Sequence, residues 1–283
     1  MPEAALAVPS MLSHRERQLL HWLAKHHVAG IGRVVDGGSF LGGSTAALAS
    51  GLAARRDGEW DRTICAYDLF RVEEYTVETF GACFPDPTIG ASFRSTFDAN
   101  VARWARYIEV REGDACDWGW TGEPIELLFL DMVKTWPLND LVLEKFLPFL
   151  IPGHSVIIQQ DYLMGYGPWT QMTMELMEPG VAILDSMPNG SVAYLLTEPV
   201  PRQLLGAKLR QTLSAAEQRT LMDRAVGRWQ GDERGLVELA RMMLIAELDG
   251  PADASRELAR VLERHTGQDR VEQAAAFLAG YLA

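Results

Sequence analysis

Four short apolar segments in the first half of the chain each lead to an aspartate. The segments lie at about 33–36, 63–68, 108–110 and 126–131, and the acids are Asp36, Asp68, Asp114 and Asp131. Short apolar runs bounded by turn residues predict buried strands, and helical patterns separate them. Strands that alternate with helices predict a parallel sheet covered by helices on both faces. We therefore expect the four acids at the carboxyl edge of this sheet, where open α/β sheets bind ligands.

Three further strands are predicted in the second half, at 155–160, 181–185 and 191–196. The last two are joined by Pro188-Asn189-Gly190, a typical hairpin turn. The fold class is therefore α/β, with a doubly wound, mostly parallel seven-stranded sheet that includes one antiparallel strand. Segments 44–52, 92–107 and 138–150 read as helices, as does the stretch after Pro168. The stretch 72–90 is rich in proline and glycine, which predicts an irregular lid.

The chain divides into three predicted parts. Residues 1–29 form a frayed tail followed by a helix, because Ser13 and Glu16 have the spacing of a capping box. Residues 30–201 carry the sheet. Residues 202–283 form a helical extension, with helices near 213–229, 233–247, 253–266 and 269–282. An apolar face in this extension needs a partner, either the body of the protein or a second copy in a homo-oligomer; it comprises Leu236, Leu239, Met243 and Leu244.

The charge of the chain disfavours some partners. Acidic residues outnumber basic ones 38 to 26, and from Arg202 onward they balance at 12 each, which leaves 26 acids against 14 bases before it. Such an acidic body is a poor ligand for nucleic acid or anionic membranes. No segment has the length and hydropathy of a membrane span. The three cysteines have no disulfide or metal spacing, and no secretory signal precedes them, so a cytoplasmic location is expected.

A glycine-rich loop, Gly37-Gly38-Ser39-Phe40-Leu41-Gly42-Gly43-Ser44, follows the first strand and opens a helix. No register supplies the three glycines of the dinucleotide pattern GxGxxG. The phosphate loop GxxxxGK[ST] fails because Gly43 stands where the lysine belongs, which disfavours triphosphate chemistry. A third pattern has an acid at the strand end and glycines two and six residues later, and Asp36, Gly38 and Gly42 match it.

This third pattern resembles motif I of class I S-adenosylmethionine-dependent methyltransferases. The resemblance implies that the loop lies against the methionine part of the cofactor and that the motif acid, Asp36, orients it. It also implies that Asp68 takes the ribose hydroxyls and that the turn at Asp114 and Ala115 contacts the adenine. The implied cofactor-binding residues are Asp36, Gly37, Gly38, Ser39, Gly42, Ser44, Asp68, Asp114 and Ala115.

The stretch from Phe129 to Lys134, Phe-Leu-Asp-x-x-Lys, resembles catechol O-methyltransferases, where the Asp binds a divalent metal and the Lys is the general base. The glycine loop and the stretch from Pro152 to Tyr162 resemble macrocin-type sugar O-methyltransferases. Both groups end the latter strand in Asp-Asp or Asp-Asn, whereas this chain has Gln160-Asp161. The catalytic residues implied are Lys134 and Asp131. Asp131, Gln160 and Asp161 either form a weaker Mg²⁺ site or are a relic of one.

The resemblance implies methyl transfer to a hydroxyl of a small molecule, either a sugar or an aromatic acceptor. Aromatic residues that follow the strand ends either line the acceptor pocket or simply pack; they are Trp136, Tyr162, Tyr166 and Trp169. Two alternatives stay open. One is transfer to nitrogen, which needs neither a base at Lys134 nor a metal. The other is a catalytically silent protein that binds the cofactor or serves as a scaffold. We expect His154 to be structural and the pair His26-His27 to be solvated.

Overall fold

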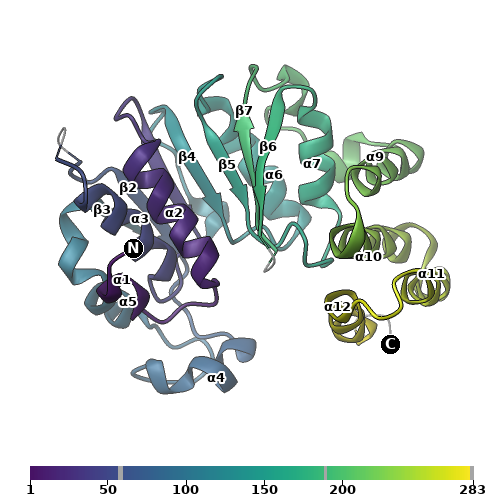
Figure 1. The fold of residues 1–283 in the computed structure, drawn as a ribbon, viewed down its shortest axis with the longest axis horizontal. Helices are drawn as coiled ribbons and strands as arrows, with labels where there is room; N and C mark the ends of the chain where they lie inside the picture. Colours follow the sequence, from purple (N-terminus) through teal and green to yellow (C-terminus); the bar gives the residue numbers. More distant parts are fainter. Residues whose placement is uncertain (57–59, 188–189, 281–283) are drawn as a thin grey trace. The chain divides into compact units, whose positions relative to one another are not determined.

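A computed structural model describes residues 1–56, 60–187 and 190–280 of the chain (Figure 1). Contacts divide the chain into two compact units. The first comprises Met1–Met132 and Phe149–Ile158, and the second comprises Val133–Pro148 and Gln159–Ala283. The predicted helical extension is part of the second unit. In the part of the chain that is described, no helix combines the length and apolar character needed to cross a membrane.

Seven strands form one sheet in the order β3-β2-β1-β4-β5-β7-β6. The strands are β1 (Arg33–Gly37), β2 (Ile64–Asp68), β3 (Ile108–Glu112), β4 (Ile125–Leu130), β5 (Val156–Gln159), β6 (Val181–Ser186) and β7 (Val192–Leu196). β1 runs parallel to β2 and β4, and β2 runs parallel to β3. β6 and β7 pair antiparallel. The seven-stranded, mostly parallel sheet is therefore confirmed, although Pro188 and Asn189 of the predicted hairpin turn lie outside the described residues.

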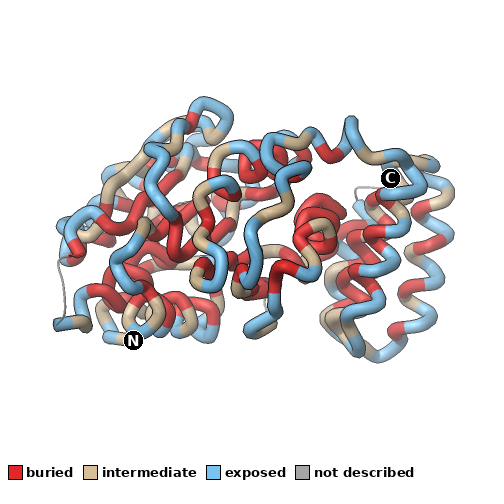
Figure 2. The backbone as a smooth tube through the Cα atoms, turned by 90° about the horizontal axis from the view of Figure 1, so that it is seen from above, coloured by how far each residue is buried: buried red, intermediate tan, exposed pale blue. Residues whose placement is uncertain are grey.

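The first unit is built on the apolar strands that the sequence predicts. Every residue of β4 is buried, as are the last four residues of β1. α2 (His14–His26) packs on α3 (Gly43–Ala53), whose small residues are buried from Gly43 to Leu52. Gly51 permits this approach, because a Cβ there would lie 2.4 Å from the His21 carbonyl oxygen. Buried residues are red in Figure 2. The capping box of Ser13 and Glu16 is confirmed.

Two predictions for the first unit are wrong. The N-terminal tail is ordered: α1 (Glu3–Leu6) and the residues after it bury Ala5 and Leu12. The Arg17 guanidinium holds this segment by donating to the carbonyl oxygens of Leu6 and Val8, both at 3.1 Å. Sequence periodicity does not predict this order, because the Arg17 side chain holds the tail through the tail's backbone carbonyl groups.

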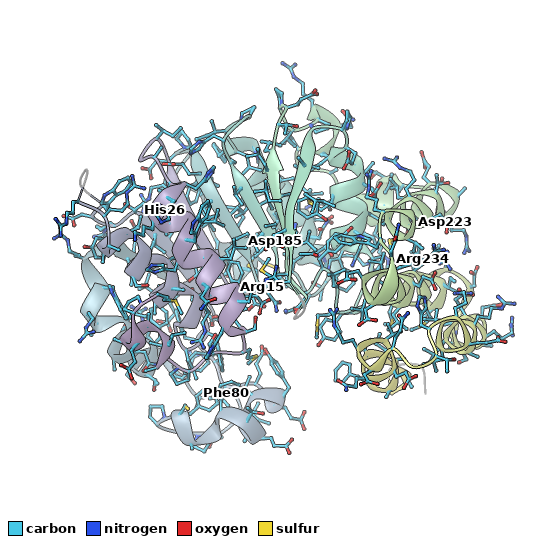
Figure 3. All side chains as sticks on the ribbon, viewed as in Figure 1. Arg15, His26, Phe80, Asp185, Asp223 and Arg234 are labelled. Carbon is cyan, nitrogen blue, oxygen red and sulfur yellow. The ribbon has the colours of Figure 1, made fainter. Side chains whose placement is uncertain are left out.

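The stretch 72–90 is also not irregular throughout, because α4 (Glu74–Phe80) and a 3₁₀ turn, η1 (Gly81–Cys83), lie within it. Phe80, at the end of α4 (Figure 3), packs edge-on against Phe40 at 5.1 Å between ring centroids. The predicted helix at 92–107 divides into α5 (Arg94–Val101) and a 3₁₀ helix, η2 (Ala102–Tyr107). The short elements that remain are η3 (Ala115–Asp117), η4 (Leu147–Phe149) and η5 (Arg202–Leu204).

The second unit is mainly helical. Its helices are α6 (Trp136–Lys145), α7 (Trp169–Met177), α8 (Leu209–Thr212), α9 (Ala215–Gly227), α10 (Gly231–Asp249), α11 (Pro251–Arg264) and α12 (Asp269–Ala279). α9 packs on α7, and α10 contacts α9, α11 and α12 (Figure 1). Leu236 and Leu239 of α10 are buried, so the predicted apolar face finds its partner within this unit. The buried Glu238 of α10 forms ion pairs with Arg234 and Arg264, and the pair with Arg264 links α10 to α11.

Candidate functional site

The glycine loop after β1 has the backbone geometry that only glycine supplies without strain. Gly38 has φ +92° and Gly42 has φ +97°. A Cβ on Gly38 would lie 2.8 Å from the carbonyl oxygen of Asp131, and one on Gly42 would lie 2.7 Å from Val101 Cγ1. The backbone amides of Gly38 and Ser39 both donate to the Tyr67 carbonyl oxygen. The loop is thus held tightly between the ends of β2 and β4.

Asp36 lies at the base of this loop and is fully buried. Its Oδ2 accepts hydrogen bonds from Ser44 Oγ at 3.1 Å and Thr45 Oγ1 at 2.5 Å. Its Oδ1 is buried and has no hydrogen-bond partner among the described residues. Burial raises the pKa of Asp36 to about 7. The hydrogen bonds from Thr45 and Ser44 lower this pKa, and the charges of Asp131 and Asp68 raise it. A buried carboxylate oxygen without a partner is costly, which suggests that a ligand completes this site.

Asp68 ends β2 beside the loop. Its Oδ2 accepts from the backbone amide of Phe40 at 2.8 Å, and its Oδ1 accepts from that of Phe70 at 2.7 Å. Burial raises its pKa to about 6 despite these amides, and the charge of Asp131 contributes to the rise. Each carboxylate oxygen has two lone pairs, so each can accept a second bond from a ligand hydroxyl.

The turn at Asp114 lies next to β2, because the Gly113 amide donates to the Asp68 carbonyl oxygen at 3.0 Å. Asp114 is exposed, and its side chain caps η3 by accepting from the Cys116 amide at 2.8 Å. Ala115 is the first residue of η3. The first unit therefore brings Asp36, Asp68 and Asp114 to neighbouring strand ends, as the alternation of strands and helices predicted.

A wall of this site comes from the N-terminal segment, which the sequence did not indicate. A small cavity at the loop is lined by Ser10, Met11 and Leu12 together with loop residues and Asp131. Ser10 lies directly on the start of α3, since a Cβ on Gly43 would lie 2.3 Å from Ser10 Cβ. The hydrogen bonds from Arg17 to the tail and the burial of Ala5, Val8 and Leu12 account for this position, and no motif in residues 1–12 could have signalled it.

Tyr75, on α4, is a second residue that the sequence analysis missed. The charges of Glu73, Asp131 and Asp68 all act on its phenol. The side chain is 68% exposed, which leaves it accessible to a ligand. The assignment of 72–90 as an irregular lid hid this residue, because the short helix that carries it has no apolar period of its own.

Lys134, Gln160 and Asp161 come together in the second unit. The Lys134 ammonium forms an ion pair with Asp161 Oδ2 and lies 3.5 Å from Gln160 Oε1. Asp161 has φ +65°, a left-handed conformation that aspartate tolerates better than most residues. The side chain of Asp161 is 11% exposed and that of Lys134 is 43% exposed. A general base must offer a lone pair, whereas here the lysine nitrogen forms an ion pair with a carboxylate.

The predicted magnesium ligands do not fit such an ion well. Asp131 belongs to the first unit, and Gln160 and Asp161 belong to the second. The pair Gln160-Asp161 supplies one carboxylate, that of Asp161, and it already forms an ion pair with Lys134. Among the described residues, no group of three or more His, Cys, Asp or Glu side chains is placed to hold a metal. Magnesium favours carboxylate oxygens in octahedral geometry, so this donor set gives it little affinity.

Trp136 and Trp169 both have structural partners. Trp136 Nε1 donates to Glu247 Oε2 at 2.9 Å, which links α6 to α10. Trp169 Nε1 donates to the Val133 carbonyl oxygen at 2.8 Å. The two rings meet edge-on at 5.9 Å between centroids. The indole of Trp169 thus fixes the backbone directly before Lys134.

The predicted pocket residues Tyr162 and Tyr166 differ in their surroundings. Tyr162 is 1% exposed and packs between Tyr194 and Trp229, so it belongs to the core of the second unit. Tyr166 is partly exposed and meets Phe277 of α12 at 5.7 Å between ring centroids. Of the four predicted aromatic residues, Tyr166 therefore has the most accessible surface.

Two histidines, His27 and His154, have structural roles in the first unit. His154 Nε2 bonds to the buried Glu126 Oε2 at 2.8 Å, as its predicted structural role requires. His27 stacks on His154 and its Nε2 bonds to the His154 carbonyl oxygen, so the prediction of a solvated residue is wrong for His27. His26, labelled in Figure 3, is exposed as expected. The cysteines are free in the described residues.

Searches among known proteins give similar solved structures at low identity. No family model matches the chain. No curated protein matches it either. One similar structure is cofactor-bound Rv0187 from MTB, with 20% identity, a TM-score of 0.43 and coverage of 69% of this chain and 87% of that one.

Two further similar structures are of CalS11. In one it is described as a calicheamicin methyltransferase, with 16% identity and a TM-score of 0.43. In the other it is the apo form of a TDP-rhamnose 3'-O-methyltransferase, with 16% identity and a TM-score of 0.44. Each comparison covers 64% of this chain and 77% of that one. Because these values are low, the function proposed for this chain rests on its own residues.

Proposed function

We propose that the chain is an S-adenosylmethionine-dependent methyltransferase that acts on a hydroxyl of a small molecule. The observation that carries the proposal is the carboxylate of Asp36, which is fully buried at the base of a tight glycine loop. One of its oxygens lacks a hydrogen-bond partner in the part of the chain that the structure describes. Asp68 and Asp131 lie close enough for their charges to act on it. A cationic sulfonium ligand is the natural complement to such a group of acids.

The cofactor is proposed to lie along the strand ends of the first unit. Gly38 and Gly42 let its methionine part approach the backbone, and the Asp36 carboxylate orients it. Asp68 accepts hydrogen bonds from the two ribose hydroxyls, in the way that acids after the second strand do in dinucleotide folds. The turn at Asp114 and Ala115 supports the adenine. These assignments follow the resemblance of the sequence, and the adjacency of the three strand ends supports them.

Methyl transfer asks little covalent chemistry of the protein. It is an in-line displacement at the methyl carbon, so alignment of donor and acceptor supplies much of the rate. A hydroxyl acceptor must also lose its proton during the reaction. The resemblance assigns this step to Lys134, but its ion pair with Asp161 suits it better to stabilising negative charge than to accepting the proton. The acidic first unit suits a neutral or cationic acceptor better than an anionic one.

A calorimetric titration with S-adenosylhomocysteine tests the proposal. The wild-type protein should bind it with a Kd of roughly micromolar size. Asp68→Ala should weaken binding by about tenfold or more, because each charge-assisted hydrogen bond contributes ~1.5–3 kcal/mol. Asp98→Ala is the matched control, since Asp98 is exposed on α5 and pairs only with Arg94 among the ion pairs described. Absence of binding by the wild type would refute the cofactor class.

A second arm separates the remaining alternatives. The protein is incubated with S-adenosylmethionine and a panel of hydroxylated and aminated small molecules, and the products are analysed by mass spectrometry. Methyl ethers support the proposed hydroxyl acceptor, and methylamines support transfer to nitrogen. Tight cofactor binding with no product from any acceptor supports a silent binding protein instead.

A further inference from the structure

A lysine ammonium lies on the two residues that, by resemblance, correspond to a divalent metal pair. Lys134 Nζ pairs with the Asp161 carboxylate and lies 3.5 Å from the Gln160 amide oxygen. Both partners are acceptors, and both follow β5 directly. The ammonium therefore contacts the same oxygen atoms that would coordinate a metal.

The backbone on each side of this contact is fixed. The carbonyl oxygen of Val133 accepts the Trp169 indole, and Thr135 caps α6 by accepting from the Leu138 amide. Asp161 lies in a tight turn, where its carbonyl oxygen accepts from the Met164 amide at 3.1 Å. Lys134 and Asp161 are thus brought together by two anchored loops, unlike a pair of flexible surface side chains.

The charges of the cluster also match a monovalent cation. A pair of carboxylates carries two negative charges and suits a divalent metal. The pair Gln160-Asp161 carries one negative charge, and the single positive charge of Lys134 balances it. A metal that entered would meet the ammonium at short range and be repelled by it, with water around the 43% exposed Lys134 side chain screening part of the repulsion.

We propose that the Lys134 ammonium is the resident cation of this site and takes the place of a divalent metal. The inference rests on the proposed methyltransferase function and deepens it. The Lys134 ammonium, held by Asp161 and Gln160, then stabilises negative charge on the acceptor oxygen. The acceptor hydroxyl releases its proton to water, and its oxygen bonds to the methyl carbon. The carbon–sulfur bond breaks with its electron pair on sulfur.

Binding of Mn²⁺, followed by electron paramagnetic resonance, tests this directly and needs no acceptor. The wild type should show no saturable binding below about 1 mM Mn²⁺. The double variant Lys134→Met/Gln160→Asp, which frees the pair and restores its second carboxylate, should bind at least about tenfold more tightly. Lys134→Arg/Gln160→Asp should gain much less, because arginine keeps the cation in place.

Lys145→Met/Gln160→Asp is the matched control, because Lys145 is also partly exposed and pairs with Glu144 at 2.7 Å. It should bind Mn²⁺ more weakly than the Lys134→Met double variant. Circular dichroism confirms that each variant is folded. Saturable binding by the wild type below about 1 mM Mn²⁺ would overturn the proposal, as would equal affinity in all three double variants. These results are independent of S-adenosylhomocysteine binding, so failure of the proposed function is seen separately.

Discussion

Burial of the Asp36 carboxyl group lowers the stability of the folded protein. The group is fully buried, one oxygen has no hydrogen-bond partner within the described residues, and burial raises its pKa to about 7. In the unfolded chain an aspartate loses its proton near pH 4. Between these two pH values the folded state binds more protons than the unfolded state, so the free energy of unfolding falls as the pH rises. Residues that are unfavourable for stability are often retained for function.

Asp36→Asn should therefore stabilise the protein at pH 8 by about 1–3 kcal/mol, with the difference vanishing near pH 4. The same variant should bind S-adenosylmethionine less tightly, because the cationic sulfonium loses a nearby charge. Urea denaturation at several pH values measures the first effect, with the exposed Asp98→Asn as the control. If the wild type and Asp36→Asn show the same dependence of stability on pH, the carboxyl group is not strained in the way described.

Which residues the sequence could identify depends on how local their signal is. The spacing of Asp36, Gly38 and Gly42 is visible in the sequence because it lies on one strand and one turn. The sequence does not show the ion pair between Lys134 and Asp161, because the two residues are far apart in the chain and only the fold brings them together. Glu126 was likewise read as an ordinary strand residue, since its partners are backbone amides far along the chain.

Among the elements, the N-terminal segment has the least expected place. Ser10 packs on Gly43 at the start of α3, and residues 10–12 line the cavity at the glycine loop. This segment has no periodic pattern, so its order comes from tertiary contacts such as those of Arg17.

Gly43→Ala should displace this segment, because the added methyl group would overlap Ser10. We expect a loss of about 1–3 kcal/mol of stability, as for overpacking in a core. Ser10→Gly in the same protein should recover part of that loss. Gly227→Ala is the control, since nothing lies within 4 Å of its added methyl. Thermal denaturation and proteolysis of residues 1–12 measure the effects. A neutral Gly43→Ala would contradict the close packing.

The start of β1 depends on a single buried acid. Glu126 is fully buried on β4 and accepts from the amides of Ala29 and Gly32 and from His154. Glu126→Ala should cost about 3 kcal/mol or more, because several charge-assisted bonds are lost together. Glu123→Ala, which removes an exposed partner of Arg33, should cost less than about 1 kcal/mol. Equal losses in the two variants, measured by urea denaturation, would show that Glu126 has no special role.

At the scale of the whole molecule, periodicity predicted the sheet and the C-terminal helices well. Strands appear as short apolar runs, and α9 to α12 appear as amphipathic segments with clear breaks such as Gly250-Pro251. Figure 2 shows the resulting alternation of buried and exposed turns in these helices. Periodicity did not predict that these helices join α6 and α7 in one compact unit, because that grouping arises from long-range contacts.

Truncation after Glu198 should damage the rest of the second unit. The buried Glu175 of α7 would lose its ion pairs with Arg224 and Arg228 of the extension. The loop at Gly165 would lose the cover of Leu239 and Leu278. We expect aggregation or a change of mass in light scattering. A truncated protein of unchanged solubility, mass and stability would show that residues 202–283 are an independent module.

The central claim is that the glycine loop and the neighbouring strand ends bind S-adenosylmethionine. A crystal structure of the protein with S-adenosylhomocysteine tests this most directly. We predict the methionine part against Gly38 with its charged end oriented by Asp36, the ribose hydroxyls on the Asp68 carboxylate, and the adenine at Asp114 and Ala115. Ligand bound elsewhere, or an Asp68 carboxylate that makes no contact with the ribose, would contradict the account.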